Sequence, residues 1–118
     1  KFKSIKMKLL IIFDKSIEIS PEKVCIHVGH SSRHIGIKLS NNPLNWQFYN
    51  LWSRNDFKTV LLRDKITDSL KSKIDDYFGY VIYDAGLDGV FAPGTVLGYA
   101  VIVPKSDETF KRLRTLKF

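Results

Sequence analysis

The sequence predicts a single α/β domain over residues 1–118, with a small mixed four-stranded sheet flanked by helices on both faces. Short apolar runs alternate along the chain with segments of helical periodicity. The chain has 118 residues, 44% of them hydrophobic, which is enough for one buried core. The last two apolar runs are separated only by the loop at residues 84–94, which favours an antiparallel pair there and therefore a mixed sheet.

The first strand and the first helix have the clearest signals. Residues 9–13 form a continuous apolar run that predicts a strand buried on both faces. Ser20 as N-cap and Pro21 at the first helical position open a helix. We expect this helix to run to about Ile35, where Gly36 stops it.

The remaining elements follow from turn residues and periodicity. Asn41-Asn42-Pro43 is expected to form a turn. The later elements are expected in this order: a helix over residues 44–53, a strand over 58–63, a helix beginning at 66–68 with Leu70, Ile74, Tyr77 and Phe78 on its apolar face, strands over 80–83 and 95–103, and a last helix over 106–116.

The charge and the single cysteine limit the class of protein. Nineteen Lys and Arg against twelve Asp and Glu give a net charge of +7 and a sequence pI near 9.6, which favours a polyanionic partner: RNA, DNA, a nucleotide or an acidic membrane surface. A basic surface with no such partner is the alternative. Cys25 stands alone, so an internal disulfide and a CxxC metal knuckle are excluded, and a reducing, cytoplasmic setting is expected. No apolar run approaches the roughly 18 residues that span a bilayer, so we expect no membrane partner.

One stripe of the first predicted helix carries a lysine and all three histidines of the chain, within an arc of about 60° at about 100° per residue: Lys23, His27, His30 and His34. Three interpretations stay open. The stripe is a solvated polar face, or it is a proton-handling or phosphate-binding face beside a cleft. Alternatively, His30 and His34 have the i,i+4 spacing of a zinc chelate, which would need Asp84 or Asp88 as a further ligand.

The loop over residues 84–94 leaves a buried strand at its carboxyl end, where ligand sites of α/β sheets lie. Asp84 stands at that end, and Asp88 follows within the loop. Gly86 permits a positive φ and a close backbone approach. Asp-Gly pairs are also common in ordinary turns, so this loop alone does not establish a site.

Two segments of the chain together resemble a known family. The helix reads Glu22-Lys23-Val24-Cys25-Ile26-His27-Val28-Gly29-His30-Ser31, and the loop reads Asp84-Ala85-Gly86-Leu87-Asp88 followed by Ala92-Pro93-Gly94-Thr95-Val96-Leu97-Gly98. Their order and spacing are similar to the first helix and the loop of the type II peptidyl-tRNA hydrolases, the archaeal and eukaryotic class. The resemblance covers nearly the whole chain. The chain departs from the family pattern by Glu22 for Gly, His27 for Gln, Phe13 for Arg and Asp88 for Thr, and residues 93–97 are two residues short.

The resemblance implies a hydrolase that cleaves the ester between a peptide, or an N-blocked aminoacyl group, and tRNA. It implies no cofactor, no metal and a homodimer. Matched position by position, it implies four catalytic residues: Lys23, His30, Asp84 and Thr95. Lys23 would stabilise an oxyanion or hold a phosphate, and Asp84 would orient Lys23 or accept a proton from water. His30 would move the proton, and Thr95 would hold the water or the terminal ribose.

Several side chains are candidates for binding the substrate, namely His27, Gly86, Asp88, Lys38, Lys58 and Arg63, with Arg54 and the amino-terminal lysines as further phosphate contacts. Trp46 or Trp52 would stack on an unpaired base, although a place in the core is the commoner role of tryptophan. Two other classes remain open: a catalytically silent relative that binds tRNA or a nucleotide, and a metal-dependent phosphoesterase that uses the three histidines and the loop aspartates.

Overall fold

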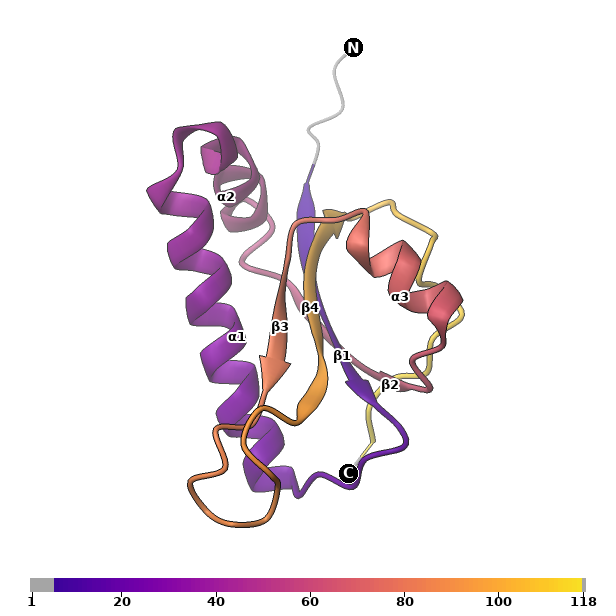
Figure 1. Cartoon of the computed structure of the whole chain (residues 1–118). Helices are drawn as coiled ribbons and strands as arrows, with labels where there is room; N and C mark the ends of the chain where they lie inside the picture. The colour runs from indigo at the N-terminus through magenta and orange to yellow at the C-terminus, as the bar shows by residue number, and fades with distance from the viewer. Residues whose placement is uncertain (1–5, 118) are drawn as a thin grey trace.

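The computed structural model describes residues 6–117 and confirms the α/β class (Figure 1). Its elements follow one another as β1 (Met7–Asp14), α1 (Pro21–Asn41), the 3-10 turn η1 (Pro43–Asn45), α2 (Trp46–Ser53), β2 (Thr59–Asp64), α3 (Asp68–Asp75), β3 (Gly79–Tyr83) and β4 (Val96–Pro104). The sheet order is β2-β1-β4-β3. β1 and β2 are parallel, and β4 runs antiparallel to both β1 and β3. The carboxyl ends of β1, β2 and β3 therefore meet at one edge of the sheet.

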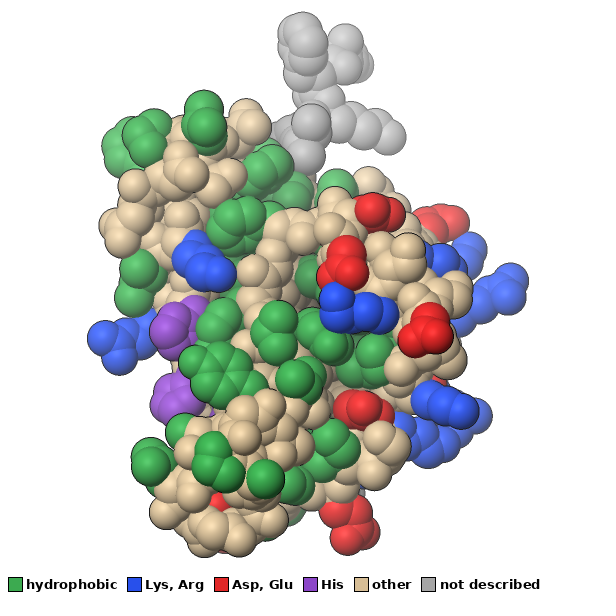
Figure 2. Space-filling model, viewed as in Figure 1, with side chains coloured by type: hydrophobic (Ala, Val, Ile, Leu, Met, Phe, Trp, Pro, Cys, Tyr) green, Lys and Arg blue, Asp and Glu red, His purple; other side chains and the backbone are tan. Residues whose placement is uncertain are grey.

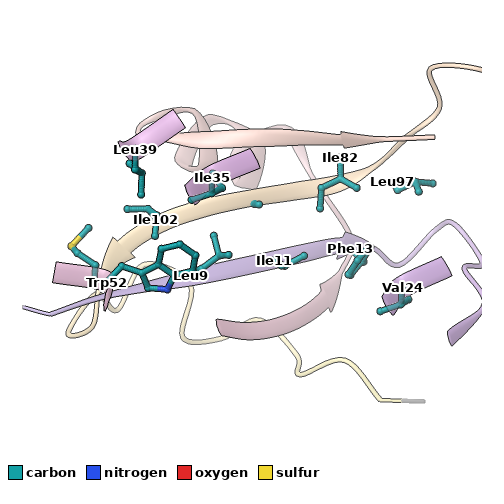
Figure 3. Packing of buried hydrophobic residues seen from close by; sticks show 12 residues of the cluster. Leu9, Ile11, Phe13, Val24, Ile35, Leu39, Trp52, Ile82, Leu97 and Ile102 are labelled. Carbon is teal, nitrogen blue, oxygen red and sulfur yellow. The ribbon is translucent and has the colours of Figure 1, made fainter. Parts of the chain in front are cut away.

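The two faces of the sheet carry two hydrophobic cores, and β1 supplies both. Leu9, Ile11 and Phe13 point toward α1 and α2, whereas Leu10 and Ile12 point toward α3, as the alternation of a strand requires. Figure 3 shows the first of these cores, in which α1 and Trp52 of α2 contribute side chains to the same layer as β1 and β4. The expectation that the first strand is buried on both faces is confirmed.

β4 contributes a close backbone approach at Gly98. This residue pairs with Phe13 of β1 on one side and with Ile82 of β3 on the other. A Cβ at this position would collide with the backbone carbonyl oxygen of Ile12. Only glycine therefore allows β4 to lie this close to β1.

The first helix is longer than the sequence predicts, because it continues through Gly36 to Asn41. The sequence predicts a stop at Gly36, but the buried face of the helix extends past it to Leu39, which is fully buried. Burial of that leucine outweighs the poor helix propensity of one glycine. The helix ends where Asn42 adopts an extended conformation before Pro43, as residues that precede proline commonly do.

The predicted last helix over residues 106–116 is wrong. This segment forms turns, and Phe110 is buried against the α3 side of the sheet. The segment then runs beside β2, where the backbone N–H of Arg63 donates to the carbonyl of Arg114 and that of Leu116 donates to Leu61. Hydrogen bonds to the open edge of β2 therefore outweigh the local helix preference of this segment.

The third helix is shorter than predicted. It ends at Asp75, so Tyr77 and Phe78 lie beyond it, and their side chains pack on opposite faces of the sheet. Strand boundaries agree with the prediction to within two residues. Within residues 6–117, no helix combines the length and the apolar character that a membrane span needs.

Candidate functional site

The candidate site lies where the first turn of α1 meets the loop that follows β3. The Ser20 side chain caps α1 by accepting a hydrogen bond from the backbone N–H of Lys23, which fixes that lysine in the first turn. Asp84 directly follows β3 at the carboxyl edge of the sheet and is only 3% exposed. Two segments that are 61 residues apart in sequence thus place a cation and a carboxylate side by side.

Lys23 is held between two carboxylates. Its Nζ lies 2.5 Å from Oδ1 of Asp84 and 2.8 Å from Oδ2 of Asp88. The other oxygen of Asp84 accepts a hydrogen bond of 2.7 Å from the backbone N–H of Gly86, whose φ of +76° suits glycine. Asp84 is therefore fixed at both oxygens, while the side chain of Asp88 remains 47% exposed.

These contacts fix the charge states of the three groups. The hydrogen bonds that Lys23 donates to Asp84 and then to Asp88 raise the pKa of Lys23 above its ordinary value, despite partial burial. The hydrogen bond from Lys23 lowers the pKa of Asp84, against the opposing effect of burial, and also lowers the pKa of Asp88. At neutral pH the cluster is one ammonium and two carboxylates. Lys23 accordingly acts as a cation and not as a base.

The histidine stripe lines a cavity of about 380 Å³ beside this cluster. His27 is buried, and its Nε2 lies 3.6 Å from Oδ1 of Asp84. Burial lowers the pKa of His27, and the nearby Asp84 opposes that effect only in part, so the imidazole is neutral at pH 7. His30 meets His27 edge to face at 5.9 Å, and the ring of His34 stacks on Tyr80 of β3 at 4.6 Å. Figure 2 shows histidine side chains at the surface along α1, next to hydrophobic side chains.

The cavity has apolar walls that the sequence did not indicate. Besides the predicted residues, it is lined by Ile26, Tyr80, Tyr83, Ala85 and Leu87. The two tyrosines come from β3, an edge strand of the sheet, and the leucine is 94% exposed on the loop. Regular alternation along β3 would place Tyr80 and Tyr83 on opposite faces, so the sequence does not group them. The register of β3 with β4 shifts between Ile82 and Tyr83, and both tyrosines line the cavity.

The structure gathers most of the predicted site residues but separates four of them. The cavity brings together Lys23, His27, His30, Asp84 and Asp88, with Gly86 directly behind Asp84.

Thr95 is not among the lining residues. Its hydroxyl donates to the carbonyl of Ala92 at 2.7 Å, and its own carbonyl accepts from the N–H of Asp84, so it closes the base of the loop. Lys38 lies in the last turn of α1 with its Nζ 5.8 Å from the ring centre of Tyr80, so it extends the stripe beyond His34.

Three other predicted phosphate contacts, Arg54, Lys58 and Arg63, are not among the residues that line this cavity. Lys58 is exposed just before β2, the edge strand on the other side of the sheet from β3. Its carbonyl accepts a hydrogen bond from the N–H of Leu9. Arg63 donates to the carbonyls of Lys15 and Ile17 and lines a separate cavity with Phe13. The amino-terminal lysines Lys1 and Lys3 lie outside the described residues.

The two tryptophans occupy different environments. Trp52 is buried in the first core, which is the commoner role of tryptophan. Trp46 is 59% exposed, and its indole N–H donates to the carbonyl of Ser40. Neither tryptophan lines the cavity beside Lys23.

The metal interpretation lacks a ligand set in the described part of the chain. Among residues 6–117, no three His, Cys, Asp or Glu side chains come together as a group that would hold a metal ion. The predicted pair His30 and His34 shares a helix face, but the ring of His34 is stacked on Tyr80, and one oxygen of each loop aspartate contacts Lys23.

Together, the fold and the site define a small α/β domain whose lysine–carboxylate cluster lies beside a histidine-lined cavity. A scan of protein-family models finds no match for this chain, and a search of curated proteins finds no similar one.

Proposed function

We propose that the protein hydrolyses the ester that joins a peptide, or an N-blocked aminoacyl group, to the 3′ end of tRNA. The proposal rests on one observation above the others: the buried contact between Lys23 and Asp84 at the mouth of a cavity lined by histidines. The resemblance of the same two segments to the type II peptidyl-tRNA hydrolases supports it. An ester hydrolase needs a fixed positive group, an oriented water and a proton carrier, and this cluster offers candidates for each.

The reaction proceeds by attack of water on the ester carbonyl carbon. The Lys23 ammonium stabilises the negative charge that develops on the carbonyl oxygen. Asp84, held by Lys23 and by the N–H of Gly86, keeps the ammonium in place. Its lowered pKa makes it an orienting group and not a strong base.

Proton transfer falls to His30, which faces the cavity from α1 one turn along the helix from His27. It takes the proton of the attacking water and gives it to the ribose oxygen as the ester C–O bond breaks, which releases free tRNA and the peptide acid. His27 is neutral and buried, so its role is to shape the cavity wall beside Asp84.

The tRNA partner matches the charge of the protein. A net charge of +7 attracts a polyanion, and Lys38 continues the stripe away from the catalytic cluster along α1. Lys58 and Arg63 lie away from the cavity and would contact other parts of a molecule as large as tRNA. A cytoplasmic location and a homodimer belong to the same proposal.

One observation favours a second candidate, a silent relative that binds tRNA without cleaving its ester. Asp88 stands where the family has threonine, and its carboxylate contacts Lys23 at 2.8 Å. That contact occupies one side of the ammonium that a substrate oxygen would use. In an active enzyme Asp88, being half-exposed, must move away when substrate binds.

Hydrolysis of N-acetylated aminoacyl-tRNA tests the proposal. We expect chelator-resistant turnover by the wild type and a loss of about 100-fold or more in both Lys23→Gln and Asp84→Asn. Lys111→Gln is a matched control, because Lys111 also pairs with a carboxylate but lies on the exposed C-terminal segment. Circular dichroism confirms that each variant is folded. Absence of turnover in folded wild type would reject hydrolysis, and retained tRNA binding would then support the silent relative.

A further inference from the structure

A second cavity, of about 560 Å³, lies between α1, α2 and the beginning of β2. Its lining residues are Ser32, Arg33, Gly36, Ile37 and Ser40 of α1, Tyr49 and Trp52 of α2, and Phe57 and Thr59 of the following turn and strand. Its volume lies within the range of about 300–1,000 Å³ that is typical of small-molecule sites.

This cavity is separate from the lysine–carboxylate cluster. The fully buried residues Ile35 and Leu39 of α1 belong to the face that packs on the sheet. At about 100° per residue, Ser32, Gly36 and Ser40 lie beyond that face from the histidine stripe, whereas the exposed Arg33 and Ile37 lie on the solvent side of α1. No residue lines both cavities. A ligand in the second cavity would therefore not touch Lys23 or Asp84.

An aromatic wall closes one side of the cavity. The ring of Phe57 packs edge to face against Tyr49 at 5.7 Å and against Trp52 at 5.0 Å, yet Phe57 remains 44% exposed. Asp56 and Phe57 both have a φ of +53°, a conformation that bulky side chains rarely adopt. The N–H of Phe57 donates to the carbonyl of Trp52 and fixes this strained turn, which presents the ring to the cavity.

The polar groups of the cavity suit an anion. Arg33 is exposed and forms no ion pair with any residue between 6 and 117. None of the lining residues is acidic. The hydroxyl of Tyr49 and that of Ser32 are further donors in the lining.

Gly36 leaves the helical side of the cavity open. Glycine is disfavoured within a helix, and a Cβ at this position would meet no atom within 4 Å. The core therefore does not require a glycine at this position. A side chain there would project into the open space that the other residues line.

We propose that this cavity binds a nucleotide, with the base against the exposed ring of Phe57 and the phosphate on the guanidinium of Arg33. A nucleotide combines a flat base with an anionic phosphate. The base can stack on an aromatic side chain, and the phosphate can accept hydrogen bonds from an arginine beside it. The nucleotide is either free or part of a single-stranded RNA. This site is independent of the proposed ester hydrolysis and of its catalytic cluster.

NMR titration of the full chain tests the proposal, with the four ribonucleoside 5′-monophosphates up to about 10 mM, which detects a Kd of about 1 mM. Parallel titrations use a short single-stranded RNA, the nucleosides alone and inorganic phosphate. We expect saturable shifts of the backbone amides at residues 32–40 and 55–59 with at least one monophosphate or with the RNA. Weaker binding of the nucleoside and of phosphate is expected, because each lacks half of the contacts. Tighter binding of RNA than of the monophosphates assigns the site to an RNA strand, and the reverse assigns it to a free nucleotide.

Two variants and a control decide whether the binding uses this cavity. Arg33→Gln should weaken the affinity about tenfold or more, because it removes a charged hydrogen bond. Gly36→Ala should weaken it as well while raising the melting temperature, so misfolding cannot explain the loss. Arg112→Gln removes the same charge from the exposed C-terminal segment and should leave the affinity unchanged. No amide shift, or an equal effect of Arg33→Gln and Arg112→Gln, would overturn the proposal. Lys23→Gln should bind nucleotide like the wild type even if the hydrolase proposal fails.

Discussion

The pH dependence of stability should depend on the buried imidazole of His27. Burial lowers the pKa of His27 below the value of 6.5 that it has in the unfolded chain. The groups that face it are Lys23 and His30 on α1 and Asp84 from the loop, and the attraction of Asp84 only partly offsets burial. The unfolded chain therefore binds the proton at a higher pH than the folded protein does. The stabilisation is complete above about pH 6.5 and is lost as the pH falls from there toward the folded-state pKa.

The size of the effect has an upper bound. One proton changes the unfolding free energy by at most about 1.4 kcal/mol per pH unit. Between pH 6.5 and about pH 5, the loss is therefore at most about 2 kcal/mol. Domains of this size have about 5–15 kcal/mol of unfolding free energy, so the loss is measurable and the protein stays folded.

Urea denaturation of wild type and His27→Gln between about pH 5 and pH 7.5 measures this effect. Glutamine is the residue that the resembled family has here, and it carries no titrating proton. We expect the unfolding free energy of His27→Gln to vary less with pH than that of the wild type. Ser40→Ala, at an exposed position on the same helix, removes no titrating group and should keep the wild-type slope. Equal slopes for wild type and His27→Gln would refute the reasoning.

Three further variants and one control, Ile37→Ala, test the packing, the charges and the helix cap. Leu39→Ala should cost about 2–5 kcal/mol, or about 12 °C in Tm for a 3 kcal/mol loss, because Leu39 is fully buried beyond the predicted end of the helix. Ile37→Ala, at a half-exposed neighbour, should cost much less in the same thermal scan, and similar losses would contradict the structure. Asp88→Asn should tighten binding of inorganic phosphate at Lys23, as followed by amide shifts, and weaker binding would show that Asp88 does not compete there. Ser20→Ala should lower the unfolding free energy by about 1 kcal/mol in urea through loss of the N-cap, and an unchanged value would exclude that role.

The sequence predicts the sheet well because its strands carry local signals. The apolar run of β1 and the antiparallel connection between β3 and β4 are both confirmed. The errors lie where tertiary contacts override local preference. Burial of Leu39 carries α1 past Gly36, and the edge of β2 takes the C-terminal segment that had been expected to form a helix.

The candidate site also has parts that the sequence predicts and parts that depend on tertiary contacts. Helical spacing predicts that Lys23 and the histidines share a face, and the carboxyl end of β3 predicts where Asp84 lies. The pairing of Asp88 with the same lysine depends on the path of the loop, which no periodicity specifies. The second cavity was missed because it depends on the packing of α2 against α1 and on the strained turn at Phe57, which no local pattern encodes.

The close approach at Gly98 predicts which residues vary together in distant relatives. Gly98 sets the spacing of β4 and β1, and its β3 partner, Ile82, lies two residues before Asp84. A side chain there would push β4 away from β1 and carry the carboxylate away from Lys23. We therefore expect each relative either to keep both Gly98 and the Lys23–Asp84 pair or to have lost both. A homologue that keeps the pair but lacks this glycine must have changed its strand register, and its loop should not be aligned with this one by residue count.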